Sequence, residues 1–264
     1  MARLRIPRAD LFLLYHAASV VRLLRLQLNF YLFVRLGASR FERLPAAWKD
    51  GRGLLLRRFH ENGALFFVQV GSNDGIRRDP IHRFIMRHRW SGIMLEPVPA
   101  IFDALISNCR GNPNLHFENV AIAEARGTLA FYSIAPEVET LPEWHDQIGS
   151  LLPETLLRYG HAIPDIEKHI VEQNVPAITY ADLMAQYQEP EVDFLHIDAE
   201  GYDHRILRSI DFAKHGPPMI LYENVILSVD ERADCKTLLQ DAGYTLIDQG
   251  ADTFAYRAEV LFAS

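Results

Sequence analysis

The sequence has little cysteine, no excess of positive charge and no long apolar run. Its 264 residues contain two cysteines, Cys109 and Cys235, which stand in no metal-binding or disulfide pattern. This excludes a disulfide-stapled miniprotein and favours a reducing compartment, so we expect the cytoplasm. The formal net charge of -7 argues against general nucleic-acid binding. The longest uncharged apolar run, Leu11–Val21, falls well short of the roughly 20 residues that span a bilayer.

Charge divides the chain into two parts. Residues 1–60 have 12 Lys and Arg against 3 Asp and Glu, whereas residues 61–264 have 15 against 31. We interpret residues 1–60 as a basic, apolar helical extension and residues 61–264 as the functional domain. Two interpretations of the extension stay open. Residues 1–36 lie on an anionic membrane as a peripheral, interfacial helix, or they pack on the body or across a homo-oligomer interface.

From residue 64 onward, short apolar runs alternate with amphipathic segments. The runs predict buried strands, and the segments predict helices that cover both faces of a parallel sheet. The expected strands are 64–70, 92–95, 115–122, 128–133, 192–197 and 218–222, followed by a terminal hairpin of 244–248 and 253–257. Ser228 and Glu231 have the spacing of a capping box at the start of the last helix.

Residues 135–175, which we call the insertion, break this alternation. Prolines separate short helical pieces there, and the segment is too long for an ordinary connection. We interpret the insertion as a lid over the active site, and the alternative is a packed helical insertion without substrate contact.

Polar residues follow the predicted strands at the edge where open parallel sheets bind ligands. The G-x-x-x-G spacing of Gly71–Gly75 allows a close backbone approach, but positions 73 and 76 lack the glycines of a dinucleotide fingerprint. Glu96 ends the second strand, where a carboxylate can accept both hydroxyls of a ribose. Together these features indicate a nucleoside ligand without a pyrophosphate. S-adenosylmethionine fits this description, since its sulfonium also favours a site rich in carboxylates.

Three ordered motifs carry a family resemblance. They are Val70-Gly71-Ser72-Asn73-Asp74-Gly75, Glu96-Pro97-Val98-Pro99 and Ile197-Asp198-Ala199-Glu200-Gly201-Tyr202-Asp203. With the stretch Val175–Leu183, they resemble the FkbM family of S-adenosylmethionine-dependent methyltransferases over about residues 64–257. Gln69 and Asp203 depart from the family pattern, in which an acidic residue and a glutamate are usual.

The resemblance implies a fold, an activity and a cofactor. The fold is α/β, the Rossmann-like class I methyltransferase fold, with a seven-stranded, mostly parallel sheet whose last strand is antiparallel. The activity is methyl transfer from S-adenosylmethionine, often to oxygen, on a sugar, a glycan or another small natural product. Two alternatives remain, a nicotinamide-dependent oxidoreductase and an inactive methyltransferase-fold binding module.

Site roles follow from these motifs. Glu96 is expected at the ribose, Asn119 and Val120 near the adenine, and the remaining cofactor-binding candidates are Gly71, Ser72, Asn73, Asp74, Gly75, Pro97 and Asp198. Asp198 is our first choice as base or metal ligand, with Glu200, His204 and Glu223 as further catalytic candidates. Asp198 and Glu223 would be the ligands of a Mg²⁺ ion, if one takes part. The competing interpretations are a surface histidine for His204 and an acid that stabilises a helix N-terminus for Asp203.

Overall fold

The structure is a computed structural model that describes residues 65–135, 141–142 and 144–257. The predictions made for the extension at residues 1–60, its membrane and oligomer interpretations included, lie outside the described residues.

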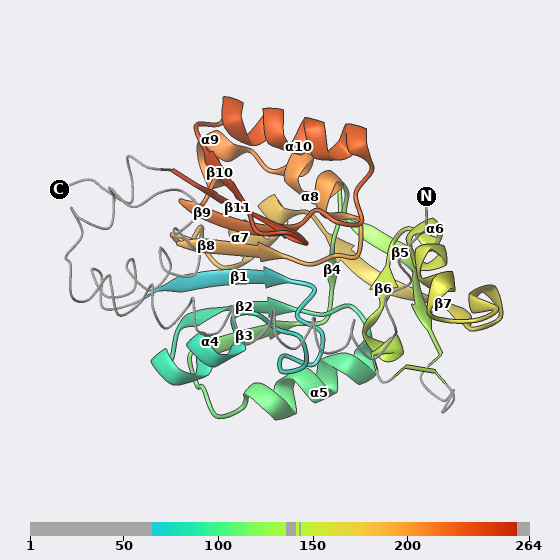
Figure 1. Ribbon diagram of the computed structural model, residues 1–264. Coiled ribbons are helices and arrows are strands. Elements are labelled where there is room, and N and C mark those ends of the chain that lie inside the picture. Colours follow the sequence, from blue (N-terminus) through green and yellow to red (C-terminus); the bar gives the residue numbers. More distant parts are fainter. Residues whose placement is uncertain (1–64, 136–140, 143, 258–264) are drawn as a thin grey trace, which may run out of the picture. The chain divides into compact units, whose positions relative to one another are not determined.

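Seven strands within the described residues form the main sheet, in the order β10-β11-β9-β8-β1-β2-β3 (Figure 1). The adjacent strands β9, β8, β1, β2 and β3 are parallel to one another, whereas β11 runs antiparallel to both β9 and β10. The predicted fold, a mostly parallel sheet with an antiparallel last strand, is thus confirmed. The strands are β1 (Phe66–Val70), β2 (Ser91–Leu95), β3 (Leu115–Glu118), β8 (Phe194–Ile197), β9 (Met219–Glu223), β10 (Thr245–Asp248) and β11 (Asp252–Tyr256).

Helices connect the parallel strands. In Figure 1, α8, α9 and α10 lie along the β9–β10 side of the sheet, and α4 and α5 lie along the β2–β3 side. The capping box expected at Ser228 and Glu231 is present, and Thr179 with Asp182 forms another at the start of α7. The helices are α4 (His82–His88), α5 (Pro99–Cys109), α7 (Tyr180–Gln186), α8 (Asp203–Ser209), α9 (Phe212–His215) and α10 (Val229–Asp241).

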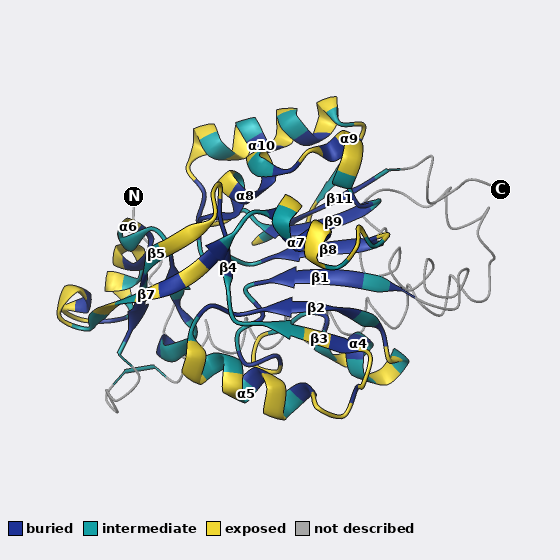
Figure 2. Cartoon of the chain, turned by 180° about the vertical axis from the view of Figure 1, so that it is seen from behind, coloured by how far each residue is buried: buried dark blue, intermediate teal, exposed yellow. Residues whose placement is uncertain are grey.

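A smaller sheet lies beyond the carboxyl edge of the main sheet in both ribbon views (Figures 1 and 2). Its described strands have the order β4-β7-β5-β6, and β7 pairs antiparallel with β5 along the whole of β5. The strands are β4 (Ala121–Ile122), β5 (Gly127–Ile134), β6 (Gly149–Ser150) and β7 (Ile170–Ile178).

The single strand predicted at 115–122 is wrong, because the chain divides it between the two sheets. β3 is the edge of the main sheet, and β4 belongs to the smaller one. Between them, Asn119 Nδ2 donates hydrogen bonds to the carbonyl oxygens of Glu96 at 2.8 Å and Pro97 at 3.0 Å. These side-chain bonds hold the turn that separates the two strands.

The purely helical description of the insertion is also wrong. Its described part contains β6, the start of β7 and short turns, which are α6 (Pro153–Leu156) and the 3₁₀ turns η2 (His145–Gln147), η3 (Leu157–His161) and η4 (Ile166–Lys168). These turns bury a small apolar core made of Ile134, Ile148, Leu156, Ile163 and Ile166. The insertion therefore has a packed interior of its own.

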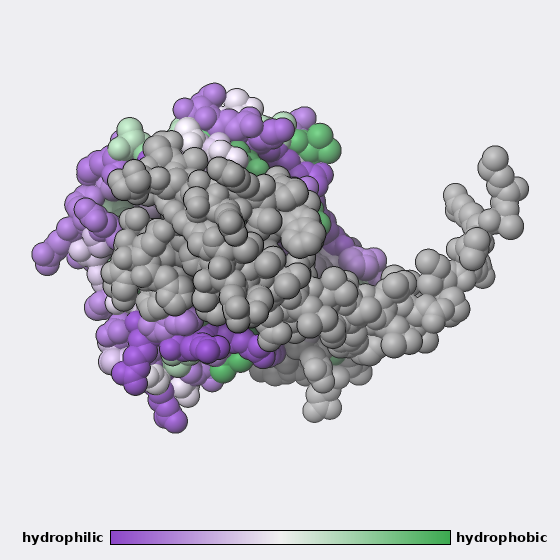
Figure 3. Space-filling view, turned by 60° about the vertical axis from the view of Figure 1, so that its left-hand side comes forward, coloured by the Kyte–Doolittle hydropathy of each residue, from purple (hydrophilic) through white to green (hydrophobic). Residues whose placement is uncertain are grey.

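Burial is concentrated in the main sheet, as Figure 2 shows. Every residue of β8 is buried, which agrees with a parallel strand covered on both faces. On the face seen in Figure 3, the described surface is mostly hydrophilic, with small apolar patches. Among the described residues, no helix has the length and apolar character needed to cross a membrane.

Candidate active site

The carboxyl ends of the parallel strands β1, β2 and β8 meet at Gly71. Its backbone has φ +77°, and a Cβ at this position would lie 1.9 Å from the carbonyl oxygen of Asp198. Only glycine fits such a close approach in the left-handed region. Backbone hydrogen bonds join the same ends, from Gly71 N to Leu95 O at 3.1 Å and from Asp198 N to Val70 O at 3.0 Å. The first and third sequence motifs are therefore in direct contact.

Glu96 lies buried beside this loop, with an exposed fraction of 5%. Its Oε2 accepts from the backbone N–H of Asn73 at 3.1 Å, and its Oε1 accepts from that of Val98 at 2.9 Å. Burial raises the pKa of Glu96 to about 7, although the two backbone donors favour the ionised form. Asn119, predicted near the adenine, holds the backbone of Glu96 and Pro97, and Val120 packs against the main core.

The other loop candidates stabilise the loop itself. Ser72 Oγ donates to Gln69 O at 3.1 Å, and Asp74 Oδ1 accepts from the N–H groups of Ile76 and Arg77. A Cβ on Gly75 would lie 2.6 Å from a methyl carbon of Leu105. These bonds and contacts fix the path of residues 71–75 before any ligand binds.

Three of the four predicted catalytic residues, with Asp203, form a carboxyl cluster at this edge. We use "carboxyl cluster" for Asp198, Glu200, Asp203 and Glu223. Asp203 is fully buried, and its two oxygens accept from the backbone N–H groups of Ala199 at 3.2 Å and Glu223 at 3.1 Å. Glu223 Oε2 is buried and has no hydrogen-bond partner within the described part of the chain. Such an atom calls for a proton or a cation.

The four carboxyl groups disfavour one another's ionisation. Burial is the largest factor that raises the pKa of each of its four carboxyl groups, and neighbouring carboxylates raise it further. For Asp203 the result is a pKa of about 7. Arg78 opposes the rise at Asp198 and Glu200. A site with this balance attracts a positively charged ligand.

The structure does not bring His204 into the cluster. Its Nε2 lies 2.7 Å from Asp234 Oδ2, and its Nδ1 lies 3.8 Å from Glu231 Oε1. Both carboxylates belong to α10, so the imidazole links α8 to that helix. The competing interpretation, a histidine of the helix surface, describes this position better.

The expected magnesium site gains no support from the geometry. No group of three or more His, Cys, Asp or Glu side chains is arranged to hold a metal ion among the residues that the structure describes. We therefore assign no metal role to Asp198 and Glu223.

Comparisons with known proteins decide the family. The model of the methyltransferase FkbM domain matches residues 69–245, about two thirds of the sequence and all three motifs. The chain belongs to the FkbM methyltransferase family. A search of curated proteins finds no match.

Solved structures similar to this FkbM domain are themselves distant from it. A methyltransferase FkbM from Methylobacillus flagellatus KT is 11% identical, with a TM-score of 0.44, over 73% of this chain and 43% of that one. The chain thus spans less than half of that protein. The Methanococcus jannaschii fibrillarin pre-rRNA processing protein is 11% identical, with a TM-score of 0.38, over 74% and 67%. Aeropyrum pernix fibrillarin, solved with bound S-adenosyl-L-methionine, is 10% identical, with a TM-score of 0.35, over 73% and 66%.

The insertion of the FkbM domain reaches the site through residues that the sequence did not single out. Asn73 Nδ2 donates to Gln147 O at 3.0 Å, and Arg77 forms a bidentate ion pair with Asp146 at 3.1 and 2.8 Å. Tyr159 Oη donates to Glu200 Oε2 at 2.8 Å. No motif marks Gln147, Asp146 or Tyr159, so only the tertiary structure reveals these contacts.

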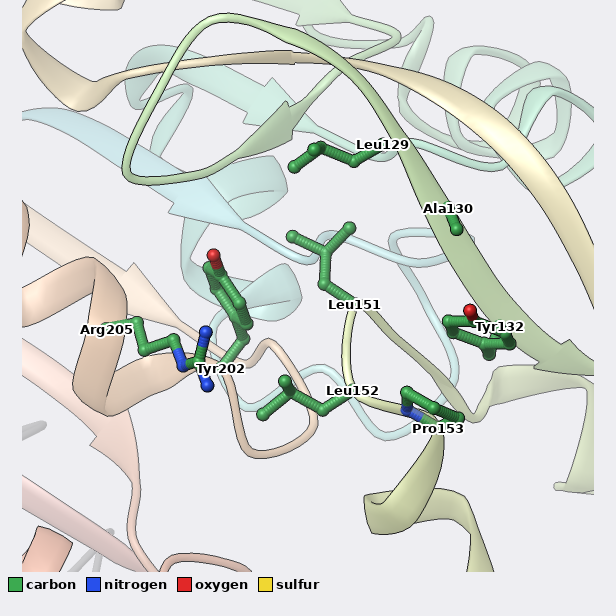
Figure 4. A pocket seen from close by; sticks show the side chains of 8 residues that line it. All are labelled: Leu129, Ala130, Tyr132, Leu151, Leu152, Pro153, Tyr202 and Arg205. Carbon is green, nitrogen blue, oxygen red and sulfur yellow. The ribbon is translucent and has the colours of Figure 1, made fainter.

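A shallow pocket of about 290 Å³ lies next to the Glu200 turn of the FkbM domain. Side chains from β5, from residues 151–153 and from Tyr202 and Arg205 surround it (Figure 4). The Arg205 guanidinium carbon lies 5.5 Å from the centre of the Tyr202 ring. Leucines, tyrosines and an arginine together offer both an apolar wall and hydrogen-bond donors.

Proposed function

We propose that the chain is an S-adenosylmethionine-dependent methyltransferase that methylates a hydroxyl oxygen of a sugar, a glycan or another small natural product. The observation that carries this proposal is the meeting of Gly71, Glu96 and the carboxyl cluster at one edge of the sheet of an FkbM domain. The ligand implied is a cationic nucleoside, and the residues fit it. Gly71 lets the loop 71–75 lie directly against Asp198, Glu96 is a carboxylate for the ribose hydroxyls, and the unpartnered Glu223 Oε2 calls for positive charge.

In this proposal the cofactor supplies an activated methyl group on a sulfonium. The chain supplies position and charge. The loop 71–75 and Asp198 are in contact, so they hold donor and acceptor in a fixed relation, and such positioning lowers a barrier by about 7–11 kcal/mol. The acceptor hydroxyl must lose a proton, and Asp198 is the proposed base. Its raised pKa makes this carboxylate a stronger proton acceptor at neutral pH.

The acceptor is the least defined part of the proposal. The pocket beside Tyr202 and Arg205 supports an acceptor with a ring that packs on apolar and aromatic side chains and with hydroxyls that accept hydrogen bonds. We therefore propose it as a subsite for the non-reacting part of the acceptor.

Asp198→Asn tests the assignment of the base. With an acceptor found by screening hydroxylated sugars, glycans and natural products for methyl incorporation, the variant should lose turnover. It should keep cofactor affinity within about tenfold of the wild type, because the change is isosteric. Asp230→Asn, at an exposed position of α10, is the matched control and should retain full activity. Unchanged turnover in Asp198→Asn would refute the assignment.

A further inference from the structure

The insertion holds Glu200 at two separate atoms. Ser150 Oγ donates to the backbone carbonyl of Glu200 at 2.9 Å, and Tyr159 Oη donates to its carboxylate Oε2 at 2.8 Å. Both donors come from a part of the chain without a recognised site motif. Glu200 is thus the member of the carboxyl cluster whose position depends directly on the insertion.

The turn at Glu200 and Gly201 has an unusual backbone conformation and packs closely against the insertion. Glu200 has φ +47°, a conformation uncommon for a residue with a side chain, and Gly201 follows with φ +91°. A Cβ on Gly201 would lie 2.7 Å from Thr155 Cγ2, so the turn packs tightly against the insertion. A residue with a side chain keeps a left-handed backbone only where the surrounding structure holds it in that conformation, and such residues cluster at functional sites.

Tyr159 is itself held in place. Its ring lies against that of Trp144, with centroids 5.7 Å apart and planes at 52°. The phenol therefore reaches Glu200 from an aromatic pair in the small core of the insertion. Its hydrogen bond occupies one carboxylate oxygen and fixes the plane of the group, which leaves Oε1 for a ligand.

The ionisable groups around Glu200 are nearly all acidic. Asp198 at the end of β8, Asp203 at the start of α8 and Glu223 at the end of β9 face it, and the Arg78 guanidinium lowers the pKa of Glu200. The Tyr159 hydroxyl favours its ionised form. A carboxylate in such surroundings gains more from an added positive charge than an isolated one would.

We propose that Glu200, held by Tyr159, is the counter-ion through which the site prefers S-adenosylmethionine to the demethylated product S-adenosylhomocysteine. This inference rests on the proposed function and adds a specificity role to it. The two ligands share their adenosine, amino and carboxyl groups, and they differ in the charge on sulfur. The ratio of their dissociation constants therefore isolates the contribution of the sulfonium.

The sign of the pH dependence follows from the chemistry. Glu200 must be ionised to attract a cation, so the preference for S-adenosylmethionine should increase as the pH rises through the pKa of Glu200. That pKa is raised by burial and by Asp198, and the Tyr159 hydrogen bond holds it down. Removal of the hydroxyl should raise it further and should move the midpoint of the preference to higher pH.

The experiment measures the dissociation constants of both ligands by calorimetry from pH 5.5 to 8.5, at constant ionic strength, on the full chain. The variants are Glu200→Gln and Tyr159→Phe, and each keeps the shape of the side chain. Tyr187→Phe is the matched control, because the Tyr187 hydroxyl donates to another glutamate, Glu118 Oε1, at 2.6 Å. Thermal unfolding of each variant checks that it is folded.

We expect Glu200→Gln to lower the preference for S-adenosylmethionine at pH 8 by about tenfold and to remove its pH dependence. Tyr159→Phe should shift the midpoint upward, and Tyr187→Phe should leave it unchanged. If Glu200→Gln keeps the wild-type preference, or Tyr159→Phe weakens both ligands equally without moving the midpoint, the inference is overturned and the proposed function stands. If the wild type binds neither ligand, both fall.

Discussion

Glu96→Gln should change the pH dependence of stability in a calculable way. The Glu96 carboxyl has a pKa of about 7 in the fold, whereas an ordinary glutamate has a pKa of 4.5. An acid whose pKa is raised on folding binds its proton more tightly in the native state. Its contribution to stability is therefore fully present below pH 4.5 and is lost as the pH rises toward 7. Glutamine does not titrate, so the variant lacks this loss.

The size of the effect follows from the two pKa values. Between pH 5 and pH 8, ionisation of Glu96 should cost the wild type about 2.5 kcal/mol that the variant does not lose. The amide can accept from only one of the two backbone donors, Asn73 and Val98, so the variant also loses about 1–3 kcal/mol at every pH. That second cost cancels when the two pH values are compared.

The assay is urea denaturation of both proteins, without ligand, at pH 5, 6, 7 and 8. The free energy of unfolding of Glu96→Gln relative to the wild type should rise by about 2.5 kcal/mol across this range. The same variant should bind S-adenosylmethionine more weakly, because its ribose acceptor is altered. A difference between the two proteins that does not change with pH would mean that Glu96 titrates normally in the fold, and it would refute the reasoning.

Two further predictions concern the fold around the site. Gly71→Ala should destabilise the domain by more than about 2 kcal/mol, because the backbone is left-handed there and the new Cβ would overlap Asp198 O. Gly127→Ala is the control. No atom lies within 4 Å of its new Cβ, so its stability should stay within about 0.5 kcal/mol of the wild type. Equal unfolding midpoints for the two variants would contradict this. Ser228→Ala removes the side chain that accepts from Glu231 N in the capping box of α10, and it should cost about 1 kcal/mol by the same denaturation assay.

The sequence predicted the parts of the fold that depend on residues close together in the chain. Continuous apolar runs such as 218–222 identified the strands of the main sheet, because a strand covered on both faces has no polar alternation. The polar residues after these strands indicated the edge where Gly71, Glu96 and Asp198 meet. The capping box at Ser228 was predicted because both of its partners lie within one helical turn.

Contacts between distant segments could not be predicted in this way. The run 115–122 contains no glycine or proline to mark a break, and the bonds from Asn119 that divide it reach a turn more than twenty residues away. β7 carries Glu172, Gln173 and Asn174 on a partly exposed sheet, so it lacks the signal of a buried strand. Asp203 resembled an acid at a helix N-terminus until its bond from Glu223 N, twenty residues away, placed it in the carboxyl cluster.

The most direct test of the central claim is calorimetric titration of the wild-type chain with S-adenosylmethionine and, separately, with NAD. The account predicts saturable binding of S-adenosylmethionine at one site, weakened in Glu96→Ala, and no measurable binding of NAD. Binding of NAD without binding of S-adenosylmethionine would contradict it and would favour a nicotinamide oxidoreductase.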